Sequence, residues 1–464
     1  MRISGEYMKK SNDFTEGNIF ISLFKFALPV MLALFLQSLY GAVDLFVVGK
    51  YASTPDVSGV ATGSMLMHTV TTVITGLSMG ITVLVGRRIG EKRPELAGKA
   101  IGAGIALFTI MTVILTILVV LGAEWLSMLM KAPEEAFCQT VDYTRICGVG
   151  MIFIIAYNVL GSVFRGIGDS TTPLITVAVA CVVNIVGDLL FVAVFDMGTA
   201  GAAYATILAQ AISVIISLLI IRKKQLPFEF SLKDIKFEKN IIKEEVKIGA
   251  PVALQDLLVG MSFLVIQAIV NSIDVIASAA TGVGSKVCSF LMLVPSAYSM
   301  SMSAFVAQNL GAQKPERAKK ALYYGIITSL VVGGLMAWLS IGHGDLLASI
   351  FDEDPAVIEA AHSYLKAYGI DCLMTPFLFC FMGYYNGHSK TVFVMLQGLI
   401  GAFCVRIPVA FLMSLREGVS LFEIALATPA STVVQIIMCI TMFVVMHRKN
   451  AKNKDLSQIY YENH

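Results

Sequence analysis

Twelve apolar runs, each long enough to cross a lipid bilayer, dominate this sequence. A transmembrane helix needs about 20 mostly apolar residues, and only helices or closed barrels satisfy the backbone polar groups inside lipid. The runs are much longer than the roughly ten-residue alternating strands of a barrel. We therefore expect an all-α integral membrane protein with transmembrane helices near residues 20–48, 58–85, 100–121, 146–165, 174–195, 200–221, 248–271, 278–307, 321–343, 367–385, 391–413 and 420–446.

The overall composition agrees with a membrane protein and excludes several other classes. Apolar residues make up 56% of the 464 residues, and charged residues make up 14%. An ordinary soluble domain has about 45–50% apolar and about 25% charged residues. The formal net charge of +2 gives no indication of nucleic-acid binding. The sequence contains no complete catalytic constellation, so we expect a protein that is not an enzyme.

Lysine and arginine are distributed unevenly among the segments between the runs. If the N-terminus is cytoplasmic, the segments on the inner side hold 26 of these residues. The segments on the outer side hold only four, namely Lys50, Lys131, Arg145 and Arg416. Because cytoplasmic loops carry the excess of positive charge, we expect both termini to be cytoplasmic. We expect the protein in the inner (plasma) membrane of a prokaryotic cell.

An internal repeat divides the chain into two halves. The segment GRRIGEKRPELAGKA (86–100) in the first half resembles AQNLGAQKPERAKKA (307–321) in the second. Each half starts on the inner side and crosses six times, which relates two six-helix bundles by a pseudo-two-fold axis along the membrane normal. The expected parts are an N-terminal lobe (1–221), a charged cytoplasmic linker (222–247), a C-terminal lobe (248–446) and a cytoplasmic tail (447–464). The linker is expected either as an amphipathic surface helix or as a solvated connection.

Two acidic residues lie deep inside the apolar runs of the first half. Asp44 lies in the first run, where Gln37 shares its helical face, and Asp188 lies in the fifth run, four residues after Asn184. A charged group at a helix centre costs about 2.5–3.5 kcal/mol on insertion scales and indicates a functional site by default. Oxygen ligands of this kind suit a small hard cation, and two neighbouring carboxylates also favour proton uptake. The alternative is that each aspartate only pairs with a polar neighbour.

The second half lacks this pair of acids. If the segment around Pro29 is aligned with the similar segment around Pro251, Asn184 corresponds to Arg406, and Asp188 corresponds to Ala410. The second half instead contains a second candidate site of two acids and two bases, which we expect to neutralise each other structurally: Asp256, Asp371, Lys286 and Arg406.

Four segments together resemble the multidrug and toxic compound extrusion (MATE) family of the MOP flippase superfamily. They are FALPVMLALFLQSLYGAVDLFVVGKYAS, FRGIGDSTTPL, NIVGDLLF and AQNLGAQKPERA, in that order. The acidic pattern of the first half is most similar to the DinF-like branch. The second copy of FRGIGDSTTP reads YYNGHSKTVF and has lost its arginine and proline. The family's pattern is therefore firmer in the first half than in the second.

The resemblance implies roles for several residues of the first half. It implies a proton or Na⁺ site made by Asp44, Asn184, Asp188 and Thr206. It also implies a substrate cleft that includes Gln37 and Asn158, and a first helix that bends at Pro29.

From these observations we expect a monomeric multidrug antiporter, coupled to H⁺ or Na⁺ and without another cofactor. Its partners would be amphipathic, often cationic drug-like compounds and the lipid bilayer. The alternative within the superfamily is a flippase of lipid-linked saccharides or other lipids, although the first half offers an acidic pocket where such flippases often have a basic cavity.

Overall fold

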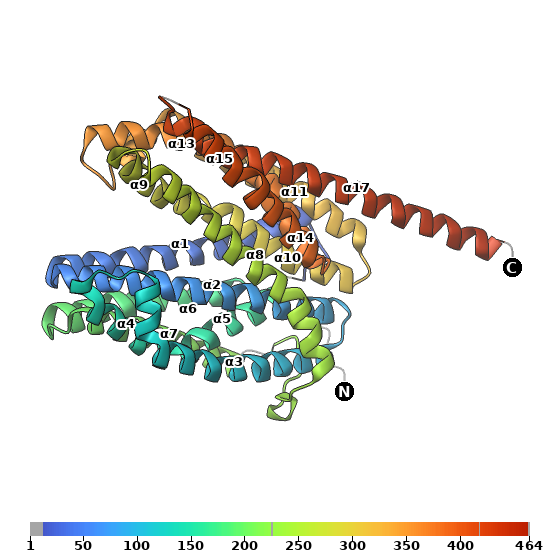
Figure 1. The fold of residues 1–464 in the computed structure, drawn as a ribbon. Coiled ribbons are helices and arrows are strands. Elements are labelled where there is room, and N and C mark those ends of the chain that lie inside the picture. Colours follow the sequence, from blue (N-terminus) through green and yellow to red (C-terminus); the bar gives the residue numbers. More distant parts are fainter. Residues whose placement is uncertain (1–12, 224–225, 417, 463–464) are drawn as a thin grey trace. The chain divides into compact units, whose positions relative to one another are not determined.

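The computed structural model describes residues 13–223, 226–416 and 418–462. Within these ranges, every regular element is a helix (Figure 1). Short 3₁₀ segments are η2 (Glu134–Ala136) and η4 (Leu232–Asp234), and π-helical segments are η3 (Leu189–Val194) and η5 (Ile400–Arg406). The α-helices are α1 (Ile19–Tyr51), α2 (Thr54–Gly90), α3 (Pro94–Leu129), α4 (Phe137–Val149), α5 (Met151–Gly166), α6 (Thr171–Asp188), α7 (Gly198–Lys223), α8 (Lys239–Asn271), α9 (Val275–Leu291), α10 (Leu293–Gly311), α11 (Pro315–Gly342), α12 (Gly344–Ala348), α13 (Pro355–Gly387), α14 (Thr391–Leu399), α15 (Ile407–Ser414), α16 (Leu421–Ala425) and α17 (Ala427–Glu462).

The helices confirm the predicted number of membrane spans. Among the described residues, eleven helical segments are long and apolar enough to cross a membrane, and a bent pair raises the number to twelve. The bent pair joins Glu134–Val149 to Met151–Gly166 at an angle of 57°. It corresponds to the expected fourth span, which starts earlier than the apolar run indicates. Helix α4 has the sequence FCQTVDYTRICGV, which contains several polar residues, so it does not stand out as an apolar run.

The described chain forms two compact units. The first consists of the residues up to Leu257 together with Ser296–Gly325 and Gly383–Val392. The second consists of Leu258–Pro295, Ile326–Met382 and the residues from Phe393 onward. Helices α8, α10, α11, α13 and α14 therefore contribute residues to both units.

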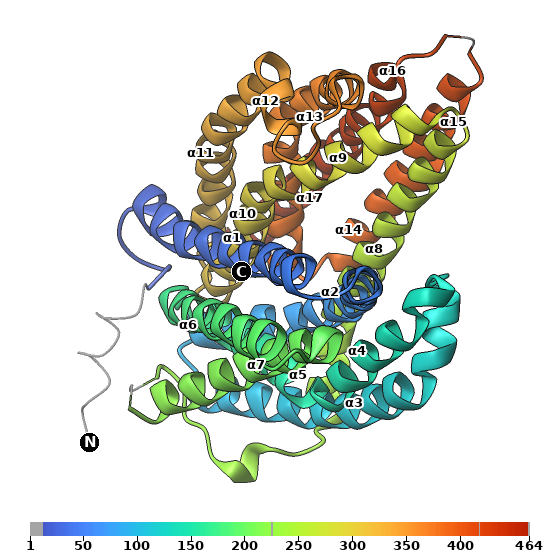
Figure 2. The ribbon, with the colours of Figure 1, turned by 90° about the vertical axis from the view of Figure 1, so that its left-hand side faces the viewer.

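In the first unit, the helices that carry the predicted site pack against one another. Helix α6 lies between α1 and α7, and α4 also contacts α7 (Figure 2). Helix α2 packs against α3, α4 and α5. Large apolar side chains such as Ile74, Ile81 and Met151 are fully buried in the core of this unit. Burial of such side chains contributes about 1.5–3 kcal/mol each, and this packing fixes the helices around the polar residues they enclose.

The predicted linker is mostly irregular where it is described. Helix α7 ends at Lys223, η4 forms a single turn, and α8 begins at Lys239, within the range expected for the linker. The Glu229 N–H donates to the Pro94 carbonyl at 3.3 Å. Gly98 and Gly102 of α3 leave the space that the backbone of residues 229–234 occupies. The connection thus lies along the start of α3.

The second unit has its own apolar core. This core is formed by α9, parts of α8, α11 and α13, and the segment from α15 to α17. Its fully buried members include Val270, Ala280, Leu365 and Ala410. Helix α17 also packs against η5, the π-helical segment that ends at Arg406. Arg406 therefore lies at the end of a segment that packs within the second unit.

Asp56 connects the start of α2 to α7 and leads to a first prediction. Its carboxylate accepts hydrogen bonds from the Ser53 N–H at 3.2 Å and from the Thr199 N–H and hydroxyl at 3.1 and 2.8 Å. We expect Asp56→Ala to lower the free energy of unfolding by about 1–2 kcal/mol, because capping donors lose their acceptor. The measurement is the thermal unfolding midpoint of the purified protein. Asp142→Ala, at an exposed acid of α4, serves as the control and should leave the midpoint within the error; equal midpoints for both variants would contradict the prediction.

Candidate functional site

Asp44 and Asp188 meet inside the first unit. Asp44 lies on α1 and is 5% exposed, whereas Asp188, the last residue of α6, is fully buried. Their carboxyl groups lie close enough to interact with each other. A carboxylate only accepts hydrogen bonds, so the two groups can bond to each other only when one of them carries a proton. The structure thus joins two acids that lie on different helices, far apart in the sequence.

The atoms around this pair lack hydrogen-bond donors among the described residues. Both oxygens of Asp188 and Oδ1 of Asp44 have no hydrogen-bond partner, and neither polar atom of the fully buried Asn184 has one. Buried polar atoms without partners are costly. A cluster dominated by unpaired oxygens suits a proton or a hard cation, which prefers oxygen ligands. The π-helical segment η3 follows Asp188 directly, and such segments occur frequently at functional sites.

Helices α1, α4 and α7 supply further polar side chains to the same cluster. Tyr40 of α1 faces Asp44 and lies beside Gln37 and Gln210. Tyr143 of α4 also faces Asp44 and lies beside Thr206. Gln37 and Thr206 therefore lie beside tyrosines that face Asp44.

Two other predicted residues of the first half have separate surroundings. Asn158 of α5 donates to the Ile154 carbonyl at 2.8 Å and accepts from the Thr75 hydroxyl at 2.9 Å, so it ties α5 to α2. Pro29 lies in the first half of α1, and the helix continues across it. Proline removes one backbone hydrogen bond from a helix interior. Helix α1 therefore lacks one of its stabilising hydrogen bonds near Pro29, between its first turns and Asp44.

The four charged residues predicted for the second half do not form one cluster. Asp256 is half-buried and belongs to the first unit, and Lys286 is exposed, with its Nζ 5.9 Å from the centre of the Phe351 ring. Asp371 and Arg406 are both buried and face each other within the second unit. Among the described residues, the ion pairs within 4.0 Å involve none of these four.

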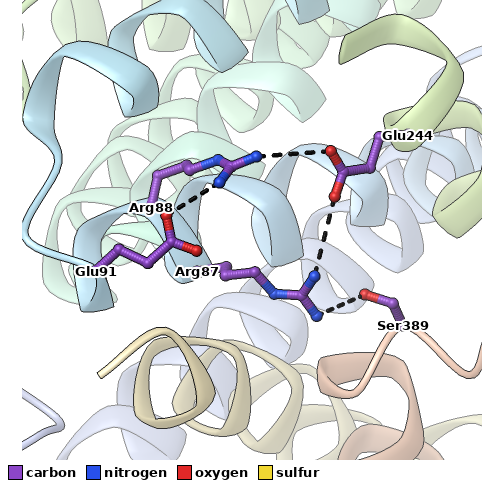
Figure 3. A network of polar contacts seen from close by, with 5 residues as sticks. All are labelled: Arg87, Arg88, Glu91, Glu244 and Ser389. Atoms are coloured by element: carbon purple, nitrogen blue, oxygen red, sulfur yellow. Dashed lines mark hydrogen bonds and ion pairs between the residues drawn. The ribbon is translucent and has the colours of Figure 1, made fainter. Parts of the chain in front are cut away.

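A separate charged network lies where α2 ends. Glu244 of α8 lies between the guanidinium groups of Arg87 and Arg88, at 3.9 and 3.7 Å, as Figure 3 shows. Arg88 also pairs with Glu91, and Arg87 donates to the Ser389 hydroxyl, both at 3.0 Å. Ion pairs that solvent still reaches, as it does here, contribute about 0–1 kcal/mol. We therefore assign this network to the alignment of α2 and α8 and not to ion binding.

Most of the chain matches one known protein family. The MatE family model matches residues 29–190 and 251–412, which together make up well over half of the chain. The chain belongs to the MATE family. The two matched segments have equal lengths and begin at Pro29 and Pro251, which confirms the internal repeat. MATE proteins are membrane transporters, which confirms the expectation of a transporter and not an enzyme. The DinF-like branch stays a prediction.

Known relatives are similar to this MATE protein in sequence or in structure along most of its length. It is 25% identical to the probable multidrug resistance protein YoeA of Bacillus subtilis, over 91% of this chain and 93% of that protein. It is 28% identical to a protein named FAD transporter from Shewanella oneidensis, over 80% and 82%. A solved structure of an outward-facing multidrug resistance MATE transporter has a TM-score of 0.88 at 18% identity, over 96% of this chain and 99% of that one. This likeness confirms the two-lobed all-helical fold of the MATE family.

The structure of this MATE protein also reveals site residues that the sequence analysis missed. Tyr40 lies four residues before Asp44, and Gln210 lies four residues after Thr206, so helical spacing alone was sufficient to find both. Tyr143 was missed because α4 was not predicted. Glu245 was counted as part of the linker, but it is a buried residue of α8, 1% exposed, and neither of its carboxyl oxygens has a partner.

Proposed function

We propose that this MATE protein is a cation-coupled antiporter that exports amphipathic, often cationic drug-like compounds. The observation that carries the proposal is the buried Asp44–Asp188 pair, whose oxygens lack donors. H⁺ or Na⁺ entering the cell would occupy this pair, and substrate would leave in exchange. The names of relatives such as the probable multidrug resistance protein YoeA support the substrate class.

The proposed driving force is sufficient for substantial export. One positive charge that enters down 100 mV releases about 2.3 kcal/mol. At about 1.4 kcal/mol per tenfold change in concentration, this free energy sustains a gradient of roughly 50-fold for a neutral solute. Coupling further requires that the two conformations bind the cation with different affinities, because a ligand that binds both equally shifts nothing.

Helix α1 supplies the conformational element in this proposal. It carries Asp44 in its second half and Pro29 in its first half. Occupancy of the acidic pair would favour one geometry of α1 at the proline, straight or bent, and would thereby close the substrate cleft near Gln37 and Asn158. We further propose a monomer in the inner membrane. The lysine and arginine distribution supports an orientation in which both termini are cytoplasmic.

The test is ethidium efflux from proteoliposomes under separately imposed gradients. A sodium gradient and a proton gradient are applied in turn to liposomes that contain the purified protein. Efflux driven by one gradient and not by the other identifies the coupling ion. Absence of efflux under both gradients, from protein that elutes as a folded species, would contradict the proposal.

A second candidate function is the export of an anionic nucleotide cofactor. The protein named FAD transporter is 28% identical to this chain, which favours this candidate. The same liposomes loaded with FAD distinguish the two functions by FAD fluorescence outside the vesicles. A flippase of lipid-linked saccharides, the alternative within the superfamily, would instead move a labelled lipid-linked sugar between the leaflets and would leave both dyes inside.

A further inference from the structure

The two matched family segments define equivalent positions in the two halves of the chain. When the segments are aligned from their first residues, Asp44 corresponds to Ile266, and Asp188 corresponds to Ala410. Asn184 corresponds to Arg406. Each position that supplies an acid in the first half is therefore apolar in the second half, and the position of the neutral amide carries a permanent cation.

The structure shows that these equivalent positions are packed in apolar surroundings. Ile266 is 4% exposed, and Ala410 is fully buried in the apolar core of the second unit. The same alignment carried into the next helix pairs Thr206 with Thr428, a buried threonine. The second half thus keeps the hydroxyl and loses both carboxylates.

Arg406 is held in this position by contacts from α8 and α13. Its Nη1 donates to the Ser262 hydroxyl at 3.1 Å, and its guanidinium lies 4.3 Å from the centre of the Phe263 ring. Ser262 is the equivalent of Tyr40, so the arginine occupies the same helix–helix junction as the acidic pair does in the first half. Tyr364 and Tyr368 of α13 also face it. Arg406 is only 6% exposed, so its charge is compensated within the protein and not by solvent.

Asp371 is the acid that balances this arginine. It lies on α13, is 3% exposed, and faces Thr432. Its charge interacts with that of Arg406, although the two side chains are not within ion-pair distance. Oδ1 of Asp371 and Nε of Arg406 both lack hydrogen-bond partners. Removal of one member of such a buried pair leaves an uncompensated charge.

We propose that the guanidinium of Arg406 is a built-in cation that takes the place of an exchangeable one in the second half. It neutralises Asp371 permanently, so the second unit binds no mobile cation and ion exchange is confined to the Asp44–Asp188 pair. The confinement of ion exchange to the Asp44–Asp188 pair rests on the proposed function. The substitution Arg406→Gln then converts the second unit into a site for a small monovalent cation, with Asp371, Ser262 and Thr432 as oxygen ligands.

The test uses Na⁺ as the probe and a parent protein that lacks the acidic pair of the first half. In Asp44→Asn/Asp188→Asn protein, the unfolding midpoint is measured in 1 and 100 mM NaCl, with choline chloride holding the ionic strength constant. We expect no sodium dependence in this parent. Addition of Arg406→Gln should produce a rise of about 2–4 °C at the higher sodium concentration. Arg406→Lys, which keeps the charge, should behave like the parent, and Asp371→Asn should cancel the gain.

The possible outcomes separate this proposal from the proposed function. A folded Arg406→Gln variant without sodium dependence overturns it, and so does a parent whose own sodium dependence disappears with Asp371→Asn. If Arg406→Gln does not fold, the double variant Arg406→Gln/Asp371→Asn decides. Recovery of folding supports neutralisation as the role of Arg406, whereas continued failure assigns the residue to packing and overturns the proposal. None of these measurements depends on transport.

Discussion

Gradient-driven efflux is expected to fall by roughly two orders of magnitude when Asp44 or Asp188 is replaced by asparagine. The two carboxyl groups form a buried contact with few donors around them. An asparagine amide donates to the remaining carboxylate and thereby imitates the protonated pair. The pair then no longer alternates between an occupied and an empty state. A shift of a two-state equilibrium from 1:99 to 99:1 requires a roughly 10⁴-fold difference in cation affinity between the two conformations. A variant that no longer binds the cation loses this difference, and with it the coupling.

The measurement is ethidium efflux from proteoliposomes that contain equal amounts of wild-type and variant protein. Asp142→Asn provides the matched control, because Asp142 is an exposed acid on α4 in the same unit. It should retain the wild-type rate. The midpoint of thermal unfolding is recorded in parallel, so that loss of transport is separated from loss of structure. Wild-type efflux from both Asp44→Asn and Asp188→Asn would show that the acidic pair does not couple the ion to the substrate.

The long apolar runs made the architecture predictable. Runs about 20 apolar residues long leave the backbone in lipid with few solutions, so the spans followed from length alone. The meeting of Asp44 and Asp188 was also predictable, because the family resemblance assigned both to one site. The rest of the site depended on helix–helix packing. The position of Tyr143 is set by α4, whose polar sequence carries no membrane signal.

The charged residues of the second half show the limit of reasoning from composition. Two acids and two bases balance in number, but balance in number does not place them together. Lys286 reaches the protein surface, and Asp256 belongs to the first unit. Only Asp371 and Arg406 face each other. The rotation of each helix about its own axis decides which charge is buried, and a near-uniformly apolar helix contains little sequence information about that rotation.

The second large effect is expected at Gly90, the last residue of α2. A Cβ atom there would overlap the backbone of Gln308, far inside the 3.0 Å limit that real Cβ atoms keep. The reverse contact exists as well, because a Cβ at Gly311 would overlap the backbone of Arg87. Backbone atoms cannot rotate away as a side chain does. The repeat in the sequence therefore records a reciprocal crossing of α2 and α10, in which each glycine leaves room for the other helix.

We expect Gly90→Ala to lower the free energy of unfolding by about 1–3 kcal/mol, the usual cost of overpacking. Because the crossing joins two equivalent helices, Gly311→Ala should have a similar effect, and the double variant should deviate from additivity. Gly334→Ala is the matched control: its Cβ meets no atom within 4 Å, so alanine should be neutral or stabilise by up to about 1 kcal/mol. The unfolding midpoint and the efflux rate are measured for all four variants. Unchanged values for Gly90→Ala would refute the crossing, since a methyl group fits there only if the two backbones lie further apart.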